Sequence, residues 1–476
     1  MVAQPDFNQF KKELKQGNVV PVCLNLPVDL ETPVSVFLKL ARKKTNVFLL
    51  ESVELGEQLG RFSLIGMDPE VVVEIQSRSH NFSNTIQKLL KQYKLSTHLK
   101  LPALVGGLVG FIGYELVQEF EDIKLKPKKG LSIPDAVFML PTNLVVFDHI
   151  KHELKLVHLA LRDQSSSAQN LYRKAERELM NMKAAMDRPV PSESKKKVSK
   201  VSKLSSNLSK SQFESLVTSA KKHIRSGDCI QIVLSQRFDL GKVEDDFRVY
   251  RALRSLNPSP YMFYLKHKNL SLVGSSPEML VRKTGLVAET RPIAGTRPRG
   301  KNAKEDAAYE ASLRASKKEM AEHIMLVDLG RNDLGRVSDP KSVKVEDFAR
   351  VERYSHVMHL VSEVKSTLKR NKSALDLLKA SFPAGTVTGA PKIKAMQIID
   401  SLEKDRRGPY AGSFGYFSLN GDMDMCITIR TIVIQNKHAY VQAGAGIVND
   451  SVPHKEYQET VNKAKALMQA VQGREI

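Results

Sequence analysis

The chain has 476 residues, of which 42% are hydrophobic and 26% are charged, with 26 glycines and 21 prolines. These proportions are typical of a soluble globular protein and exclude collagen-like, disulfide-rich and wholly disordered chains. Lysine and arginine outnumber aspartate and glutamate by 73 to 52, and the net charge of +21 suits an anionic partner or substrate, or simply a basic surface.

Cysteine usage and the distribution of apolar residues indicate the cellular compartment of the protein. Cys23, Cys229 and Cys426 form no CxxC pair and are typical of buried thiols in a reducing compartment. The first residues lack the basic-then-apolar pattern of a signal peptide. The apolar, glycine-rich stretch 101–112 is shorter than the ~20 residues that cross a bilayer, so it predicts a buried strand and a tight turn. We therefore expect a cytoplasmic protein without a membrane span.

Residues 1–186 are predicted to combine short strands with a few helices. The hydrophobic pattern predicts strands at 46–51, 70–76, 143–147 and 154–159, and a helix at 168–186.

Residues 187–208 are rich in Ser, Lys and Pro and poor in large apolar side chains, which predicts a solvated linker. The alternative is that the lysines of this segment hold nucleic acid, but no aromatic residues are interleaved for base stacking.

Residues 209–476 begin with a helix in which Ser211 and Glu214 have the spacing of a capping box and Gly227 marks the end. Further along the chain, strands are predicted at 230–237, 263–266, 270–274, 412–419, 425–435 and 439–443, and helices at 306–328, 391–402 and 455–470. Because the strands come in consecutive groups without steady β–α–β alternation, we expect antiparallel sheets with outer helices.

Two pairs of carboxylates stand on predicted helices. Glu319 and Glu322 are three residues apart, as are Glu456 and Glu459, so each pair shares one helix face. Like charges at this spacing indicate either a solvated face or a bound cation, and oxygen ligands without neighbouring Cys or His favour Mg²⁺.

Two other segments suit anionic ligands, and a third falls short of a dinucleotide motif. Residues 292–297 place a turn and a hydroxyl beside a guanidinium, which suits a carboxylate. Residues 382–392 enter a helix whose first amides can hold an anion, although the P-loop spacing is absent. Residues 444–446 follow a strand but lack the third glycine of a dinucleotide fingerprint.

Taken together, these segments resemble the chorismate-utilising enzymes, and most closely the anthranilate synthase component I family. The resemblance is carried, in order, by 292–300, 321–333, 354–359, 382–392, 407–412, 420–424 and 444–459. It covers nearly all of 209–470 and, more weakly, 20–160. It implies an α+β fold of two large, near-orthogonal antiparallel sheets with outer helices. It also implies a regulatory region at 1–186, the linker at 187–208 and a chorismate-binding catalytic region at 209–476.

The resemblance assigns roles to particular residues. Glu322 and Glu459 would bind Mg²⁺, with Glu319 and Glu456 supporting through water. Glu278 would be the general acid for the leaving hydroxyl, a role that needs a raised pKa, whereas by itself it suggests only a surface turn. His359 would serve the elimination of pyruvate, although a lone histidine is more often structural. Thr386 is implied as a further catalytic residue. The implied substrate-binding residues are Gly295, Thr296, Tyr410, Arg430, Gly444, Ala445, Gly446 and Lys463.

Two positions separate reactions within the family. Aminodeoxychorismate synthases typically carry a nucleophilic lysine where this chain has Ala294, and isochorismate synthases carry a water-activating lysine where it has Gln231. With neither lysine, ammonia is the expected nucleophile, and anthranilate plus pyruvate are the expected products. The alternatives are an aminodeoxychorismate synthase component and, from another class, a basic nucleic-acid-binding protein.

The resemblance also implies regulation and a partner. Ser52, Pro260, Tyr261 and Met262 would contact L-tryptophan as a feedback inhibitor, although these segments could instead only pack the two halves together. Because no cysteine lies in a glutaminase setting, ammonia would come from a separate glutaminase subunit, and a heterotetramer is the implied assembly.

Overall fold

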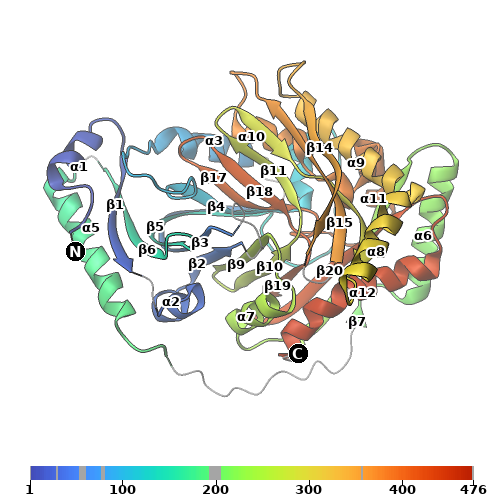
Figure 1. Ribbon diagram of the computed structural model, residues 1–476, viewed down its shortest axis with the longest axis horizontal. Coiled ribbons are helices and arrows are strands. Elements are labelled where there is room, and N and C mark those ends of the chain that lie inside the picture. The colour runs from blue at the N-terminus through green and yellow to red at the C-terminus, as the bar shows by residue number, and fades with distance from the viewer. Residues whose placement is uncertain are drawn as a thin grey trace.

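The computed structural model describes residues 2–27, 30–52, 60–76, 81–163, 165–191, 205–354 and 357–473. Within these ranges, twenty strands form one hydrogen-bonded network whose strand pairs are all antiparallel, accompanied by twelve α-helices and two short 3-10 helices (Figure 1). This confirms the predicted α+β class. Residues 192–204 of the predicted linker, and residues 355 and 356, lie outside the described residues.

The network has two branches that share two long strands, β3 (Phe62–Ile75) and β5 (Ala136–Asp148). Residues 143–148 of β5 pair with β6 and residues 136–139 pair with β4, so the sheet divides along β5. The first branch contains β1 (Val19–Pro27), β6 (Glu153–Leu161), β2 (Asn46–Glu51), β9 (Tyr261–His267), β10 (Leu270–Ser276), β19 (Thr431–Gln435), β20 (His438–Ile447) and β8 (Gln231–Lys242), with β7 (Ser205–Ser206) and β16 (Gly389–Ala390) on β8. The second contains β4 (Gly107–Ile112), β17 (Ser413–Ser418), β18 (Met423–Ile427), β11 (Met279–Thr284), β12 (Val287–Thr290) and β15 (Val357–Thr367), with β13 (Ile293–Pro298) and β14 (Lys344–Arg353) on β15. The two predicted sheets are therefore branches of one network.

Helices surround both branches (Figure 1). They are α1 (Phe7–Glu13), α2 (Pro33–Leu40), α3 (Phe82–Gln92), α4 (Val117–Phe120), α5 (Ala168–Met186), α6 (Lys210–Arg225), α7 (Asp246–Leu256), α8 (Ala303–Ala315), α9 (Lys317–Gly335), α10 (Ala374–Ser381), α11 (Lys392–Leu402) and α12 (Pro453–Gln472), with the 3-10 helices η1 (Tyr114–Leu116) and η2 (Gly385–Val387). None of the described helices is both long and apolar enough to span a membrane.

Aromatic stacking marks two large hydrophobic cores. In one core, Phe263 of β9 stacks on Phe414 of β17 with ring centroids 3.9 Å apart, so this core joins the two branches. In the other, Phe37 of α2 stacks on Phe247 of α7 at 4.0 Å, and helices pack there against the first branch. Such pairs add about 0.5–1.5 kcal/mol beyond the area they bury.

Several predicted boundaries are confirmed and three are wrong. The strand at 46–51 and the helix at 168–186 have the predicted bounds, and 101–112 contains the fully buried β4. The capping box of α6 is formed by Ser209 and Gln212, two residues before the predicted pair, because this earlier pair has the same spacing.

The other two wrong predictions each joined two elements that the structure separates. The predicted helix 306–328 is divided into α8 and α9 at Ser316, whose extended backbone and side chain cap α9. The predicted strand 425–435 is divided into β18 and β19, and Arg430 between them has a φ of 50°. This left-handed conformation cannot continue a strand.

Candidate active site

A cavity of about 570 Å³ lies among strands β8, β13 and β20 and helices α9 and α12. This volume is typical of small-molecule sites. The residues predicted above that line it are Glu278, Gly295, Thr296, Glu319, Glu322, His359, Thr386, Tyr410, Arg430, Gly444, Gly446, Glu456, Glu459 and Lys463. Ala445 does not line it, because neighbouring residues of a strand point to opposite faces and its side chain is buried in a core with Ile232 and Leu234.

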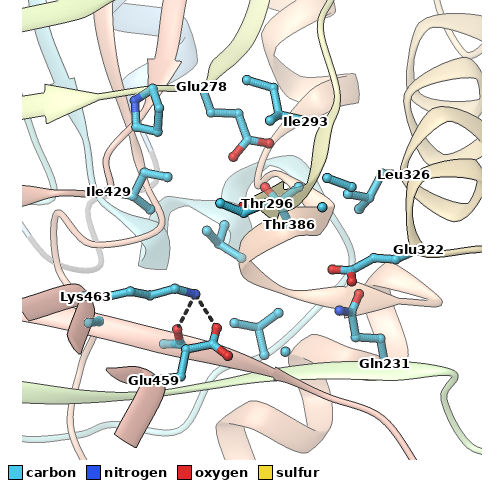
Figure 2. Close-up of a pocket in the computed structure, with 18 of the residues that line it drawn as sticks. Gln231, Glu278, Ile293, Thr296, Glu322, Leu326, Thr386, Ile429, Glu459 and Lys463 are labelled. Carbon is cyan, nitrogen blue, oxygen red and sulfur yellow. Dashed lines mark hydrogen bonds and ion pairs between the residues drawn. The ribbon is translucent and has the colours of Figure 1, made fainter. Parts of the chain in front are cut away.

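Glu278 is a buried acid between β10 and β11. Its residue is only 8% exposed, and its carboxyl points into the cavity beside Thr296 and Thr386 (Figure 2). Burial raises the pKa of Glu278 to about 8, although the Thr386 hydroxyl and the Lys463 charge oppose the shift. Glu278 is therefore largely protonated at neutral pH and can donate a proton. The surface turn that its local sequence suggests is wrong.

His359, on β15, is held in one tautomer. Its Nδ1 lies 2.9 Å from the carbonyl oxygen of Gly295 and 3.0 Å from Oγ1 of Thr296. Because a carbonyl can only accept, Nδ1 carries the proton and Nε2 is left as the basic nitrogen. Burial lowers the pKa of His359, which keeps the ring neutral near pH 7.

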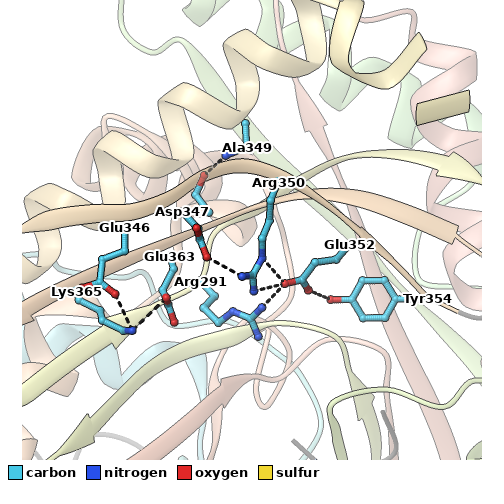
Figure 3. Close-up of polar contacts among 10 residues, drawn as sticks. Arg291, Glu346, Asp347, Ala349, Arg350, Glu352, Tyr354, Glu363 and Lys365 are labelled. Carbon is cyan, nitrogen blue, oxygen red and sulfur yellow. Dashed lines mark hydrogen bonds and ion pairs between the residues drawn. The ribbon is translucent and has the colours of Figure 1, made fainter. Parts of the chain in front are cut away.

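Tyr354, which packs against this histidine, belongs to an ion-pair network (Figure 3). Arg350 and Arg291 both bind the Glu352 carboxylate, and Tyr354 donates a hydrogen bond to Oε2 of Glu352 at 2.8 Å. The Tyr354 ring packs edge-on against His359 with centroids 5.6 Å apart. Through Tyr354, the network therefore holds one side of the imidazole in place.

Three glycines make room for polar side chains. A Cβ on Gly444 would lie 2.4 Å from the Tyr410 hydroxyl, and one on Gly446 would lie 2.5 Å from Nε2 of Gln231. Gly295 has a φ of 67°, a conformation that favours glycine, and its carbonyl orients His359.

Cationic groups line another part of the cavity. The Arg430 guanidinium makes no hydrogen bond within the described ranges, and burial lowers its pKa. Lys463 donates to the Gly444 carbonyl at 3.0 Å and pairs with Glu459 at 2.7 Å (Figure 2). A half-buried guanidinium without a bonded carboxylate among the described residues suits an anionic ligand.

The four predicted glutamates reach the same cavity from two helices. Glu319 and Glu322 lie on α9, and Glu456 and Glu459 on α12. Burial and the Glu319 charge raise the pKa of Glu322, and burial also raises that of Glu456. In the part of the chain that the structure describes, no three His, Cys, Asp or Glu residues are close enough to enclose a metal ion. The chemistry of the donor set, carboxylate oxygens on two helices, fits a hard cation.

Some lining residues were not predicted as part of the site. Lys318 stands next to Glu319, and Gln442 lies on β20. Nothing in the sequence marks either one, because an exposed lysine in a first helical turn and a polar residue on a strand are common. Gln231 faces Glu322 in Figure 2 and its Oε1 is buried without a hydrogen-bond partner.

A second cavity, of about 360 Å³, lies between the N-terminal and C-terminal parts of the chain. All four residues predicted to contact an inhibitor line it, namely Ser52, Pro260, Tyr261 and Met262. The Tyr261 hydroxyl donates to Asp424 at 3.0 Å, and Oγ of Ser52 is buried with no hydrogen-bond partner in the part of the chain that the structure describes. The cavity combines apolar walls with a few polar groups, as ligand sites do.

A buried carboxylic acid, a neutral histidine, paired glutamates and an unpaired arginine around one cavity define an enzyme that performs acid–base chemistry on a small anionic molecule. The family of chorismate binding enzymes matches residues 45–469, and the chain belongs to this family.

Similar proteins agree with this assignment. The chain is 43% identical to anthranilate synthase component 1 of Acetivibrio thermocellus, with 98% of both chains covered, and 45% identical to that of Aquifex aeolicus, with 98% of this chain and 97% of the relative covered. The crystal structure of anthranilate synthase component I from Streptococcus pneumoniae superposes with a TM-score of 0.78 at 36% identity, covering 93% of this chain and 99% of that one.

Proposed function

We propose that the protein converts chorismate and ammonia to anthranilate and pyruvate, as the large subunit of an anthranilate synthase in tryptophan biosynthesis. The observation that carries this proposal is the arrangement in one cavity of a protonated Glu278, a neutral His359 and an Arg430 guanidinium that no described residue pairs with. Glu278 protonates the departing ring hydroxyl, which leaves as water while ammonia adds at C2. His359 then serves the elimination of pyruvate through its free Nε2.

Mg²⁺ belongs to this proposal as the cofactor. Glu322 and Glu459 would hold the ion, with Glu319 and Glu456 in support, and the presence of all four carboxylates in the lining of one cavity supports the assignment. When bound, the ion neutralises the ring carboxylate and the charge that develops as the hydroxyl departs. Arg430, Tyr410 and the Gly444–Gly446 backbone would hold the second carboxylate of the substrate.

The absence of a lysine at two positions favours ammonia over other nucleophiles. Ala294 and Gln231 both line the cavity, and neither can act as a nucleophile or a base. Lys463, which does line it, is engaged by Glu459 and the Gly444 carbonyl.

A separate glutaminase subunit would supply the ammonia. Cys23, Cys229 and Cys426 are all buried, and burial raises the thiol pKa of Cys23 to about 12 and of Cys229 to about 11. Such thiols do not form the thiolate that a glutaminase needs. We place the complex in the cytoplasm.

The second cavity would bind L-tryptophan as a feedback inhibitor. Residues from 1–186 contribute part of its wall, whereas all residues that line the first cavity lie within 209–476, which supports a regulatory and a catalytic region. L-tryptophan should inhibit the enzyme, and Ser52→Ala should weaken inhibition severalfold without changing uninhibited activity. Ser83→Ala, which removes another buried unpartnered hydroxyl, is the control. Equal inhibition of all three proteins would contradict this assignment.

The proposed reaction is tested with the purified chain, chorismate, Mg²⁺ and ammonium at mildly alkaline pH. Anthranilate is followed by fluorescence and all products are identified by mass, with and without EDTA. EDTA-sensitive anthranilate formation is expected. Aminodeoxychorismate or isochorismate as the product would overturn the assignment based on Ala294 and Gln231.

A further inference from the structure

A third and much smaller cavity adjoins the active-site cavity at Glu278. Its volume is about 40 Å³, and it shares Glu278, Leu326 and Thr386 with the active-site cavity. Its other walls include Asp333, on α9, and Ser381, the last residue of α10. Glu278 therefore stands at the boundary between the substrate cavity and this one.

Two buried hydroxyls belong to the small cavity. Oγ of Ser381 is inaccessible and has no hydrogen-bond partner among the described residues, and Ser381 is only 4% exposed, whereas Oγ1 of Thr386 is also inaccessible and interacts with the Glu278 carboxyl. Leaving a buried polar group unsatisfied costs about 1–3 kcal/mol. A water molecule needs roughly 10–15 Å³ and two to four polar partners, so this cavity has the space and the groups to bind one.

Asp333, which lines the cavity, belongs to a charged pair. Nζ of Lys392 donates to Oδ2 of Asp333 at 2.7 Å and to the backbone carbonyl of Ser381 at 3.3 Å. Lys392 thus links the Asp333 carboxylate to the residue that carries the unpaired hydroxyl. Burial also raises the pKa of Asp333, so this carboxyl holds a proton more readily than an exposed one.

We propose that a water molecule bound between Ser381 and Thr386 returns a proton to Glu278 on each turnover. This inference rests on the proposed function, in which Glu278 gives its proton to the departing hydroxyl and remains as a carboxylate. Bound substrate occupies the first cavity, so the proton arrives from behind. One O–H bond of the water breaks as the bond to Glu278 forms, and the water regains a proton from the Asp333–Lys392 pair, which takes one from solvent. The amino group that ammonia forms at C2 releases one proton, so each turnover takes one proton inward along this path, gives one up from the added nitrogen and transfers no electrons.

In this scheme Ser381 is a positioning residue, because it acts through the water. Ser381→Ala should lower kcat about tenfold, a fraction of what general acid catalysis contributes, and change the KM for chorismate by less than about twofold. The ratio of kcat in H₂O to that in D₂O should rise, because reprotonation of Glu278 becomes rate-limiting. Ser413→Ala is the matched control, since Ser413 is also buried with an unpaired hydroxyl but does not line the small cavity.

Ser381→Gly separates a proton path from a structural role. Glycine leaves space for a second water, so this variant should recover part of the kcat that Ser381→Ala loses. A purely structural role predicts the reverse order, because glycine destabilises a helix more than alanine.

Unchanged kcat in Ser381→Ala, or a fall in kcat accompanied by equal changes in KM and melting temperature, would overturn the proposal. So would a crystal structure without a water at Ser381. An unaltered chain that makes no anthranilate would overturn the proposed function itself, whereas an active chain with an unimpaired Ser381→Ala variant would overturn only the relay.

Discussion

The hydroxyl of Tyr410 occupies the space that Gly444 leaves open on β20. A Cβ at position 444 would lie 2.4 Å from this hydroxyl and 2.9 Å from the Leu234 carbonyl of the paired strand β8. The carbonyl belongs to a hydrogen-bonded strand pair and cannot retreat, so an added methyl group must displace the tyrosine.

Gly444→Ala should therefore weaken chorismate binding. We expect the KM for chorismate to rise about tenfold or more, since each 1.4 kcal/mol of lost interaction is worth a factor of ten. Steady-state kinetics measure the effect, and Gly335→Ala, where a Cβ meets nothing within 4 Å, is the control. An unchanged KM in Gly444→Ala would show that Tyr410 does not contact the substrate.

Glu322→Gln should abolish turnover at any Mg²⁺ concentration, because it removes a charged ligand of the proposed ion. Activity is titrated against Mg²⁺ in both proteins. Asp328→Asn on the same helix is the control, since that exposed carboxylate pairs only with Arg331. Near-normal activity in Glu322→Gln would eliminate the metal assignment.

The amination step should slow as the pH rises through about 8. Burial raises the pKa of Glu278 to about 8, and only the protonated acid can serve the leaving hydroxyl. The rate is measured at a constant concentration of unprotonated ammonia, so that the titration of ammonium does not mask the effect. A rate that stays flat to pH 9.5 would contradict the role of Glu278.

Glu278→Gln should be inactive but more stable than the unaltered protein in alkaline solution. The folded-state pKa of Glu278 is raised, so between its ordinary value of 4.5 and about 8 the folded protein binds more protons than the unfolded chain. The free energy of unfolding therefore falls as pH rises through this window, and the glutamine, which does not titrate, avoids the loss. Thermal denaturation at pH 5 and pH 9 compares the two, with a gain of several degrees expected only at pH 9. If the two proteins melted at equal temperatures at pH 5 and again at pH 9, burial would not destabilise the charged form of this carboxyl.

His359→Ala should spare amination more than elimination. The aminated intermediate should accumulate, because alanine lacks the basic Nε2. In the unaltered protein Nε2 is free, since the Gly295 carbonyl accepts a hydrogen bond from Nδ1. Products are separated and identified by mass, with His438→Ala, a histidine paired with Asp239 at the surface, as the control. Normal anthranilate output without the intermediate would rule out the role.

Local patterns were sufficient for much of this fold. The alternation of apolar residues placed the strand at 46–51 and the helix at 168–186 with the observed bounds, because these elements follow their own periodicity. The i, i+3 spacing put Glu319 beside Glu322 and Glu456 beside Glu459 for the same reason. Where two local solutions had equal spacing, as at Ser209 and Ser211, the sequence offered no means to choose.

The tertiary structure alone decided the chemistry of the site. Glu278 follows an ordinary Ser-Ser-Pro turn, and its raised pKa comes from burial between strands that the sequence does not align. Likewise, α9 and α12 are more than a hundred residues apart, and only the packing of both against the sheet brings their glutamates to one cavity. A sequence determines periodicity and residue chemistry locally, whereas burial and the meeting of distant charges depend on every contact of the folded chain.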